Sequence, residues 1–131
     1  MPAVLQRIVR ESGVQAGDAV IEVGPGTGNL TRHLLAAGAR VTAIEKDRRL
    51  FEELSAGGVD ASQLSLVCDD VLRVDLRALA RQMSAASGGE NVRVVANLPY
   101  NITTDFLKKS LPLGDAVTDL FVMVQDEVAQ R

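Results

Sequence analysis

The chain of 131 residues contains no tryptophan, one histidine and one cysteine, and aromatic residues make up only 3% of it. Because Cys68 is alone, no disulfide bond can form within the chain, which fits a reducing compartment. No apolar run is long enough to span a bilayer, and no charged-then-apolar signal segment opens the sequence. We therefore expect a soluble intracellular protein that does not contact membranes.

A strongly basic balance, which is typical of nucleic-acid-binding domains, is also missing, since the net charge is −3. A nucleic-acid partner would need a local basic surface, or one that lies outside this chain. The sequence does contain 47% hydrophobic residues, enough for the core of a single domain.

Short apolar segments alternate with amphipathic ones along the whole chain. This alternation predicts an α/β protein with a Rossmann-like, mostly parallel sheet and flanking helices. We expect strands over Ala19–Val23, Arg40–Ile44, Leu64–Cys68, Val92–Ala96 and Leu120–Val124. We expect helices over Pro2–Ser12, from Leu30 to Gly38, after a cap at Asp47, and over Asp75–Ala86 with Asp75 as its cap. A last helix is expected after a threonine cap at Thr103 or Thr104, closed by Pro112 and Gly114.

A glycine-rich turn follows the first predicted strand. Gly24, Gly26 and Gly28 give the pattern G-x-G-x-G, and Asn29 stands where a dinucleotide fingerprint has its third glycine. Glu22, just before the turn, would repel a pyrophosphate and favour a cationic ligand. S-adenosylmethionine carries an ammonium and a sulfonium group and no phosphate, so the turn is similar to the first motif of class I methyltransferases. An ordinary strand-to-helix turn is the alternative.

Acidic residues end the second and third predicted strands. Glu45 lies about 20 residues after the glycine turn, the place from which a carboxylate accepts hydrogen bonds from both ribose hydroxyls. Asp69 and Asp70 follow the third strand, where a carboxylate can accept a hydrogen bond from the amine of adenine. We favour Asp70 for this contact and keep Asp69 as the alternative. No third ligand lies near the pair, so we predict no metal site.

The fourth predicted strand leads into Asn97, Leu98, Pro99 and Tyr100. Pro99 restricts Leu98 to an extended conformation and so fixes the Asn97 side chain and the Leu98 carbonyl, which are both acceptors. Two acceptors that hold the N–H bonds of an aromatic amine can direct its lone pair towards a methyl donor. Tyr100 can stack on the base, which is worth roughly 1–3 kcal/mol. The tetrapeptide therefore predicts a catalytic site for amine methylation; a strand-ending turn is the alternative.

With these motifs together, the chain resembles the ribosomal RNA adenine N6,N6-dimethyltransferases, which modify two adjacent adenosines near the 3′ end of the small-subunit RNA. The resemblance covers essentially the whole chain, and its signatures are Glu22–Thr31, Ala43–Asp47, Asp70–Leu72, Asn97–Thr104 and Gln125–Arg131. Leu111–Asp115 and the segment Gln125–Glu127 are most similar to the plastid-type branch, and the compartment, either the cytoplasm or a plastid or other organelle, stays open.

The resemblance implies S-adenosylmethionine as cofactor and small-subunit ribosomal RNA, or a pre-ribosomal particle, as partner of a monomeric enzyme. It implies a cofactor site formed by Glu22, Gly24, Gly26, Glu45, Lys46, Asp70, Val71 and Asn97, with Tyr100 against the target adenine. The family also has an N-terminal Gln-Asn-Phe-Leu segment, two further strands and a small helical domain. Residues 1–131 are thus expected to be a partial catalytic domain.

Two other functions stay open. DNA-adenine and protein-glutamine methyltransferases share the chemistry, but they usually carry Asp-Pro-Pro-Tyr or Asn-Pro-Pro-Tyr, and Leu98 argues against them. A non-catalytic nucleic-acid-binding, ribosome-assembly or transcription factor could keep the fold, although the presence of Glu45, Asn97 and Tyr100 argues against lost chemistry. The glycine spacing disfavours a dehydrogenase.

Overall fold

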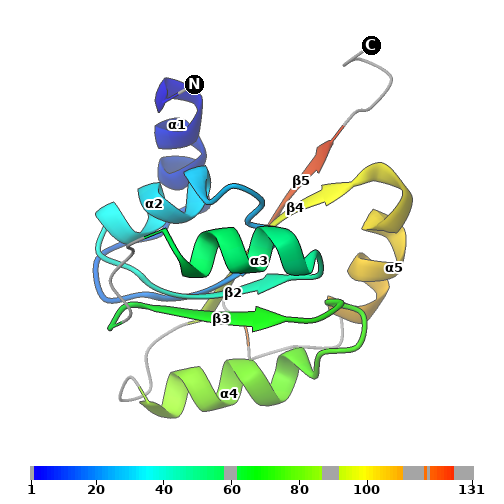
Figure 1. The fold of residues 1–131 in the computed structure, drawn as a ribbon. Coiled ribbons are helices and arrows are strands. Elements are labelled where there is room, and N and C mark those ends of the chain that lie inside the picture. Colours follow the sequence, from blue (N-terminus) through cyan, green and yellow to red (C-terminus); the bar gives the residue numbers. More distant parts are fainter. Residues whose placement is uncertain (1, 58–61, 87–91, 111–116, 118, 126–131) are drawn as a thin grey trace.

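The computed structural model describes residues 2–57, 62–86, 92–110, 117 and 119–125 (Figure 1). Helices and strands alternate through these residues, as the sequence predicts. The helices are α1 (Pro2–Ser12), α2 (Asn29–Ala36), α3 (Arg48–Ser55), α4 (Leu76–Ala86) and α5 (Tyr100–Ser110). The strands are β1 (Ala19–Val23), β2 (Arg40–Glu45), β3 (Leu64–Cys68), β4 (Val92–Pro99) and β5 (Asp119–Gln125). Within the part of the chain so described, no helix has the length and apolar character needed to cross a bilayer.

The strands form one parallel sheet in the order β3-β2-β1-β4-β5. β1 lies at the centre, and the chain moves outward from it first through β2 and β3 and then, on the other side, through β4 and β5. The order therefore reverses between β1 and β4. Ligands of open α/β sheets bind beyond the carboxyl ends of the strands at such a switch point. The predicted Rossmann-like fold is confirmed.

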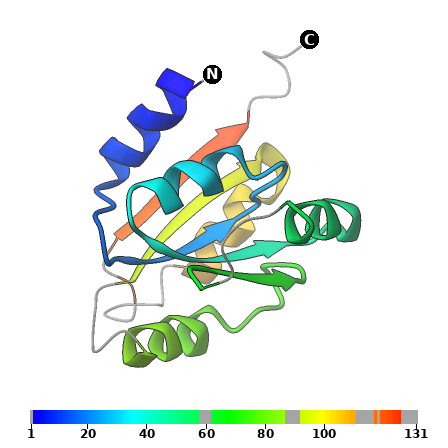
Figure 2. The same ribbon diagram turned by 60° about the vertical axis from the view of Figure 1, so that its left-hand side comes forward.

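Both faces of the sheet are covered by helices, α1 and α2 on one face and α4 and α5 on the other (Figure 2). Side chains of β1 alternate between the two faces. Ile21 belongs to the cluster that contains Leu76 of α4 and Phe106 of α5. Val20 belongs to the cluster that contains Leu34 of α2. Burial on both faces explains why the strands are apolar throughout.

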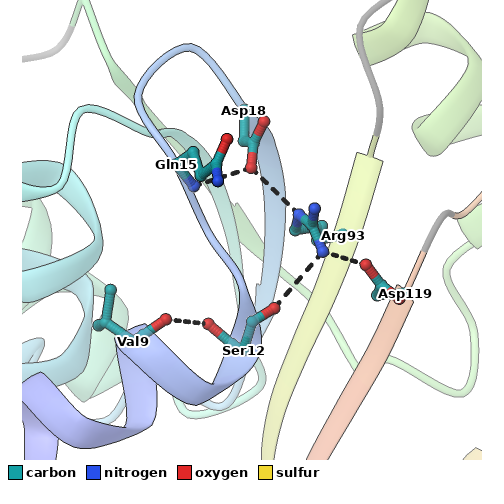
Figure 3. Close-up of polar contacts among 6 residues, drawn as sticks. All are labelled: Val9, Ser12, Gln15, Asp18, Arg93 and Asp119. Atoms are coloured by element: carbon teal, nitrogen blue, oxygen red, sulfur yellow. Dashed lines mark hydrogen bonds and ion pairs between the residues drawn. The ribbon is translucent and has the colours of Figure 1, made fainter.

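An arginine ties four segments together at the amino edge of the sheet (Figure 3). Arg93 of β4 donates through Nε to Asp18 Oδ2 at 3.1 Å and through Nη1 to the Ser12 carbonyl at 3.5 Å. Nη1 also contacts the carboxylate of Asp119, the first residue of β5. Asp18 Oδ2 accepts a further bond of 2.8 Å from the Gln15 N–H. This network joins the end of α1 and the turn before β1 to β4 and β5.

The predicted helix caps at two aspartates are confirmed. The Asp47 carboxylate accepts hydrogen bonds from the N–H groups of Arg49 and Leu50 at the start of α3. Asp75 accepts one from the Ala78 N–H at the start of α4. The predicted ranges of α1, β1 and β3 agree with the structure, whereas β2 and β5 extend one residue or more beyond the predicted bounds.

The predicted end of β4 and the predicted start of α5 are wrong. β4 does not stop at Ala96, because β5 continues to pair with it as far as Pro99. α5 begins directly after Pro99, at Tyr100, and not after a threonine cap. The Thr103 hydroxyl instead donates to the Pro99 carbonyl at 3.0 Å, a bond within the first turns of the helix. The helix-closing residues expected in 111–116 and the segment 126–131 lie outside the described residues.

Candidate functional site

Two adjoining cavities lie at the carboxyl ends of β1, β2 and β4, and both are lined by Gly24 and Asn97. The larger cavity has a volume of about 440 Å³, and its walls include Val23, Ile44, Glu45, Lys46, Asp47, Asp69, Asp70, Val71, Leu98, Pro99 and Ile102. The smaller cavity measures about 370 Å³ and is lined by Val4, Leu5, Glu22, Pro25, Gly26, Thr27, Asn29 and Leu30. Every predicted site residue with a described side chain lines one of the two.

Glu22 is the buried acid of the smaller cavity. The alternation along β1 directs its side chain to the face covered by α2, and it is only 1% exposed. There the hydroxyl of Thr31, in the first turns of α2, donates to Glu22 Oε1 at 2.5 Å. On β4, Asn97 lies on the same face of the sheet as buried Val95, two residues before it, and it also lines the smaller cavity.

The charge of Glu22 depends on pH in the neutral range. Burial raises the pKa of the Glu22 carboxyl from 4.5 to about 7, the Thr31 hydrogen bond lowers it, and the charge of Glu45 raises it further. A cation that entered the smaller cavity would favour the carboxylate and draw the pKa down again. The smaller cavity can therefore hold a cationic group against a carboxylate that is largely screened from water.

Glu45 lies at the end of β2 and joins it to the glycine turn. Its Oε1 accepts a hydrogen bond from the Gly26 N–H at 3.1 Å, and its Oε2 accepts one from the Asp47 N–H at 2.9 Å. Each carboxylate oxygen has a second lone pair, so Glu45 can still accept bonds from a ligand in the larger cavity. These two bonds fix the carboxylate at the wall of the larger cavity.

The glycine turn brings the main chain of β1 close to that of β4. Gly24, Gly26 and Gly28 have φ angles of +74°, +58° and +88°, which side-chain-bearing residues rarely adopt. A Cβ atom on Gly24 would lie 2.6 Å from the main-chain oxygen of Asn97. Glycine is therefore required at position 24 for both its conformation and its contact.

The turn after β3 presents two aspartates to the larger cavity. Asp70 is half-buried: its Oδ1 accepts a bond of 3.0 Å from the Leu72 N–H, and its Oδ2 lies 3.8 Å from Lys46 Nζ. Asp69 is exposed, and its Oδ1 accepts a bond of 2.7 Å from the N–H of Asp70. Val71 is buried and lines the cavity beside them. Both aspartates stay candidates for the adenine contact.

Asn97, Leu98 and Pro99 form the last part of β4 and line the larger cavity. The pairing of β4 with β1 ends at Ala96. Beyond that residue β4 pairs with β5 on one side, and its other side borders the cavities. Tyr100 is the first residue of α5, and its side chain lies outside the described part of the structure.

Other residues that line or support the two cavities were not predicted from the sequence. Thr31 pairs with Glu22, Val4 and Leu5 of α1 form a wall of the smaller cavity, and Ile102 of α5 forms part of the larger one. Thr31 and Ile102 lie within the signature segments Glu22–Thr31 and Asn97–Thr104, but the motifs assigned them no role, and Val4 and Leu5 lie in no motif. The periodicity of α2 places Thr31 beside buried Leu34, which could have indicated its burial but not its partner.

The lining groups define which ligands fit. The larger cavity combines apolar walls with four carboxylates and a single cationic side chain, Lys46, among its described lining residues. Hydroxyl and amino groups, which donate hydrogen bonds, suit such a surface, whereas a pyrophosphate would be repelled. The site therefore fits a nucleoside with a cationic extension better than a dinucleotide.

Comparison with known proteins agrees with this chemistry. The profile of the family described as ribosomal RNA adenine dimethylase matches residues 1–131. Proteins named ribosomal RNA small subunit methyltransferase A are similar to the chain: that of Magnetococcus marinus is 44% identical over 130 residues, covering 99% of this chain and 45% of the relative. That of Protochlamydia amoebophila is 38% identical over 128 residues, covering 98% and 44%.

Solved structures show the same fold. The chain is similar to the 23S rRNA methyltransferase ErmE, with a TM-score of 0.74, 25% identity, and coverage of 98% of this chain and 48% of that one. It is also similar to a dimethyladenosine transferase from Plasmodium falciparum, with a TM-score of 0.69, 26% identity, and coverage of 100% and 44%. The chain spans somewhat less than half the length of these relatives. The family profile extends over the entire chain, which therefore belongs to the ribosomal RNA adenine dimethylase family.

Proposed function

We propose that the chain forms the cofactor- and target-binding part of an S-adenosylmethionine-dependent enzyme that methylates the N6 amine of adenosines in small-subunit ribosomal RNA. The observation that carries the proposal is the set of acceptors at one sheet edge. Glu22, Glu45, Asp70 and Asn97 line two cavities that adjoin at Gly24. The family membership and the names of the relatives support the RNA substrate.

The residues of the two cavities fit S-adenosylmethionine. Glu22 would attract the cationic amino-acid end, Glu45 would accept from the ribose hydroxyls, and Asp70 or Asp69 would accept from the adenine amine. Lys46 and Val71 would border the adenosine. When bound, this cofactor would supply an electrophilic methyl group on its sulfonium.

The end of β4 would hold the target amine. The Asn97 side-chain oxygen and the Leu98 carbonyl would each accept one N–H bond of the adenine amine, turning its lone pair towards the cavity. Pro99 would keep Leu98 extended, and Tyr100 would stack on the base. The stacking energy of roughly 1–3 kcal/mol is comparable to the few kcal/mol that base flipping costs.

Such a site needs no strong base before transfer. The amine lone pair would take the methyl group as the bond from that carbon to the sulfonium sulfur breaks, leaving a neutral thioether, and the positively charged methylated amine would then release its proton to water. The contribution of the chain is the orientation of the two reactants, which lowers the barrier through proximity. The acceptors at the end of β4 would supply this orientation.

Transfer of labelled methyl groups to small-subunit RNA with two adjacent target adenosines tests the proposal. Asn97→Ala should abolish transfer while largely sparing the fold. Gln82→Ala, at an exposed position of α4 that lies outside the signature segments and both cavities, is the control and should keep wild-type activity. Full activity of Asn97→Ala would remove Asn97 from catalysis.

The same assay separates the other functions. RNA binding without transfer, by a chain that binds the cofactor, would favour a non-catalytic assembly or transcription factor. Transfer to DNA adenine or to protein glutamine, in preference to RNA, would favour the related N6-amine enzymes. We propose a monomeric enzyme, and size measurement in solution during the same preparation checks this point.

A further inference from the structure

Helix α5 connects the predicted target site to the predicted adenine site. It begins at Tyr100, directly after the end of β4. Lys109, the second-last residue of α5, extends to the turn that follows β3. Its Nζ donates a hydrogen bond to the main-chain carbonyl of Leu72 at 2.7 Å.

The turn that receives this bond carries Asp70. The N–H of Leu72 donates to Asp70 Oδ1 at 3.0 Å, and the N–H of Arg73 donates to the Asp70 carbonyl at 2.8 Å. Lys109 therefore holds the carbonyl of Leu72, and the N–H of the same leucine orients the Asp70 carboxylate. Val71, between them, is 5% exposed and packs in the same cluster as Phe106 of α5. The turn is thus fixed to α5 by an apolar contact and by the lysine.

Lys109 differs from its neighbour Lys108 in this respect. Both lie in the last turn of α5, where a cation is favourable for the helix dipole. Lys108 is exposed, whereas Lys109 is half-buried and is bonded to a carbonyl of another segment. Stabilisation of the helix end alone would not require that bond.

We propose that Lys109 is a positioning residue for adenine recognition: by holding Leu72 it keeps the Asp70 carboxylate in place for the exocyclic amine of the cofactor. The inference rests on the proposed function, because it takes Asp70 to be the adenine contact. It adds to that function a link between the adenine site and the helix that starts at the target site. Without the lysine, the turn would have to be ordered when the ligand binds, and affinity would fall.

The test compares two ligands in calorimetric titrations: S-adenosylmethionine, and its analogue in which the adenine lacks the exocyclic amine. Lys109→Met should weaken the first by about tenfold, the value of one charged hydrogen bond, and the second by far less. Lys108→Met, the matched control, should bind both like the wild type. Lys109→Arg, which keeps a cationic donor, should restore most of the preference for the amine.

Three results would overturn the inference. If Lys109→Met and Lys108→Met bind both ligands equally well, Lys109 does not position Asp70. If Lys109→Met loses the same affinity for both ligands, Lys109 stabilises the fold only and does not contribute to recognition of the amine. Failure of the wild type to bind S-adenosylmethionine would refute the proposed function and this inference with it. Circular dichroism monitors folding. Lys109→Gln, a milder change with the same expected direction, replaces Lys109→Met if that variant does not fold.

Discussion

The Gly26 N–H donates a hydrogen bond to Oε1 of Glu45 at 3.1 Å, across 19 positions of the sequence. The turn after β1 and the acid at the end of β2 therefore form one unit. Ligand recognition and the conformation of the turn depend on the same carboxylate, which is 7% exposed.

Replacement of Glu45 tests its predicted contact with ribose. Glu45→Ala removes the acceptor for two hydroxyls and leaves two main-chain N–H groups without their partner, so we expect S-adenosylmethionine to bind at least about tenfold more weakly. Glu52→Ala, at an exposed position of α3, is the control and should bind normally. Calorimetry measures both, and unchanged affinity in Glu45→Ala would exclude the ribose contact.

The close approach of Gly24 to Asn97 predicts a strong effect of a single methyl group. Gly24→Ala places a Cβ atom 2.6 Å from the Asn97 oxygen at a φ of +74°, so the end of β4 must shift. Gly17→Ala has a similar φ of +88° but meets nothing within 4 Å, and it should cost only the backbone strain of roughly 1–3 kcal/mol.

Urea denaturation and cofactor titration of the two glycine variants provide the measurement. Gly24→Ala should lose more stability than Gly17→Ala and should also lose cofactor binding, while Gly17→Ala keeps it. Similar losses of stability, together with normal binding in both, would contradict the close contact.

Buried Glu22 makes stability depend on pH. Its pKa is about 7 in the folded chain and 4.5 as the ordinary value, so between these pH values the folded state holds a proton that the unfolded state has released. The unfolding free energy should therefore fall as pH rises through this window, by roughly 3 kcal/mol at 1.36 kcal/mol per pKa unit, and level off above pH 7.

Glu22→Gln cannot ionise and still accepts from Thr31, so its stability should change less over the same window. Urea denaturation at pH 5 and pH 8 measures the difference, and Glu52→Gln is the exposed control. Equal slopes for wild type and Glu22→Gln would show that another group carries the dependence. Glu22→Gln should also bind the cationic cofactor more weakly at pH 8.

The network at Arg93 predicts a loss of stability far from the cavities. Arg93→Met leaves Asp18, whose side chain is 14% exposed, without its cation, and it should cost about 3 kcal/mol of unfolding free energy. Arg7→Met breaks an exposed pair with Glu11, worth at most about 1 kcal/mol. Thermal denaturation compares the two, and equal small losses would contradict a structural role for Arg93.

Local patterns sufficed for much of the fold. The glycines of the turn, the caps at Asp47 and Asp75 and the apolar strands all act within a few residues, so the sequence predicts them. The end of β4 did not follow these rules, because pairing with β5 continues the strand through Asn97 and Leu98. The predicted threonine cap of α5 is likewise not formed, because β4 continues to Pro99 and the helix begins at the next residue.

The contacts that complete the site join distant positions. Lys109 and Leu72 are 37 residues apart, and Arg93 and Asp18 are 75 residues apart. A residue's own pattern indicates its burial but not its partner. The motif residues of the site could be predicted, while the groups that hold them could not.

Titration of the chain with S-adenosylmethionine and with NAD tests the central claim most directly. The account predicts one bound S-adenosylmethionine per chain, no binding of NAD, and a large loss of affinity in Glu45→Ala. Binding of NAD in place of S-adenosylmethionine, or S-adenosylmethionine binding that is unaffected by Glu45→Ala and Gly24→Ala, would contradict it.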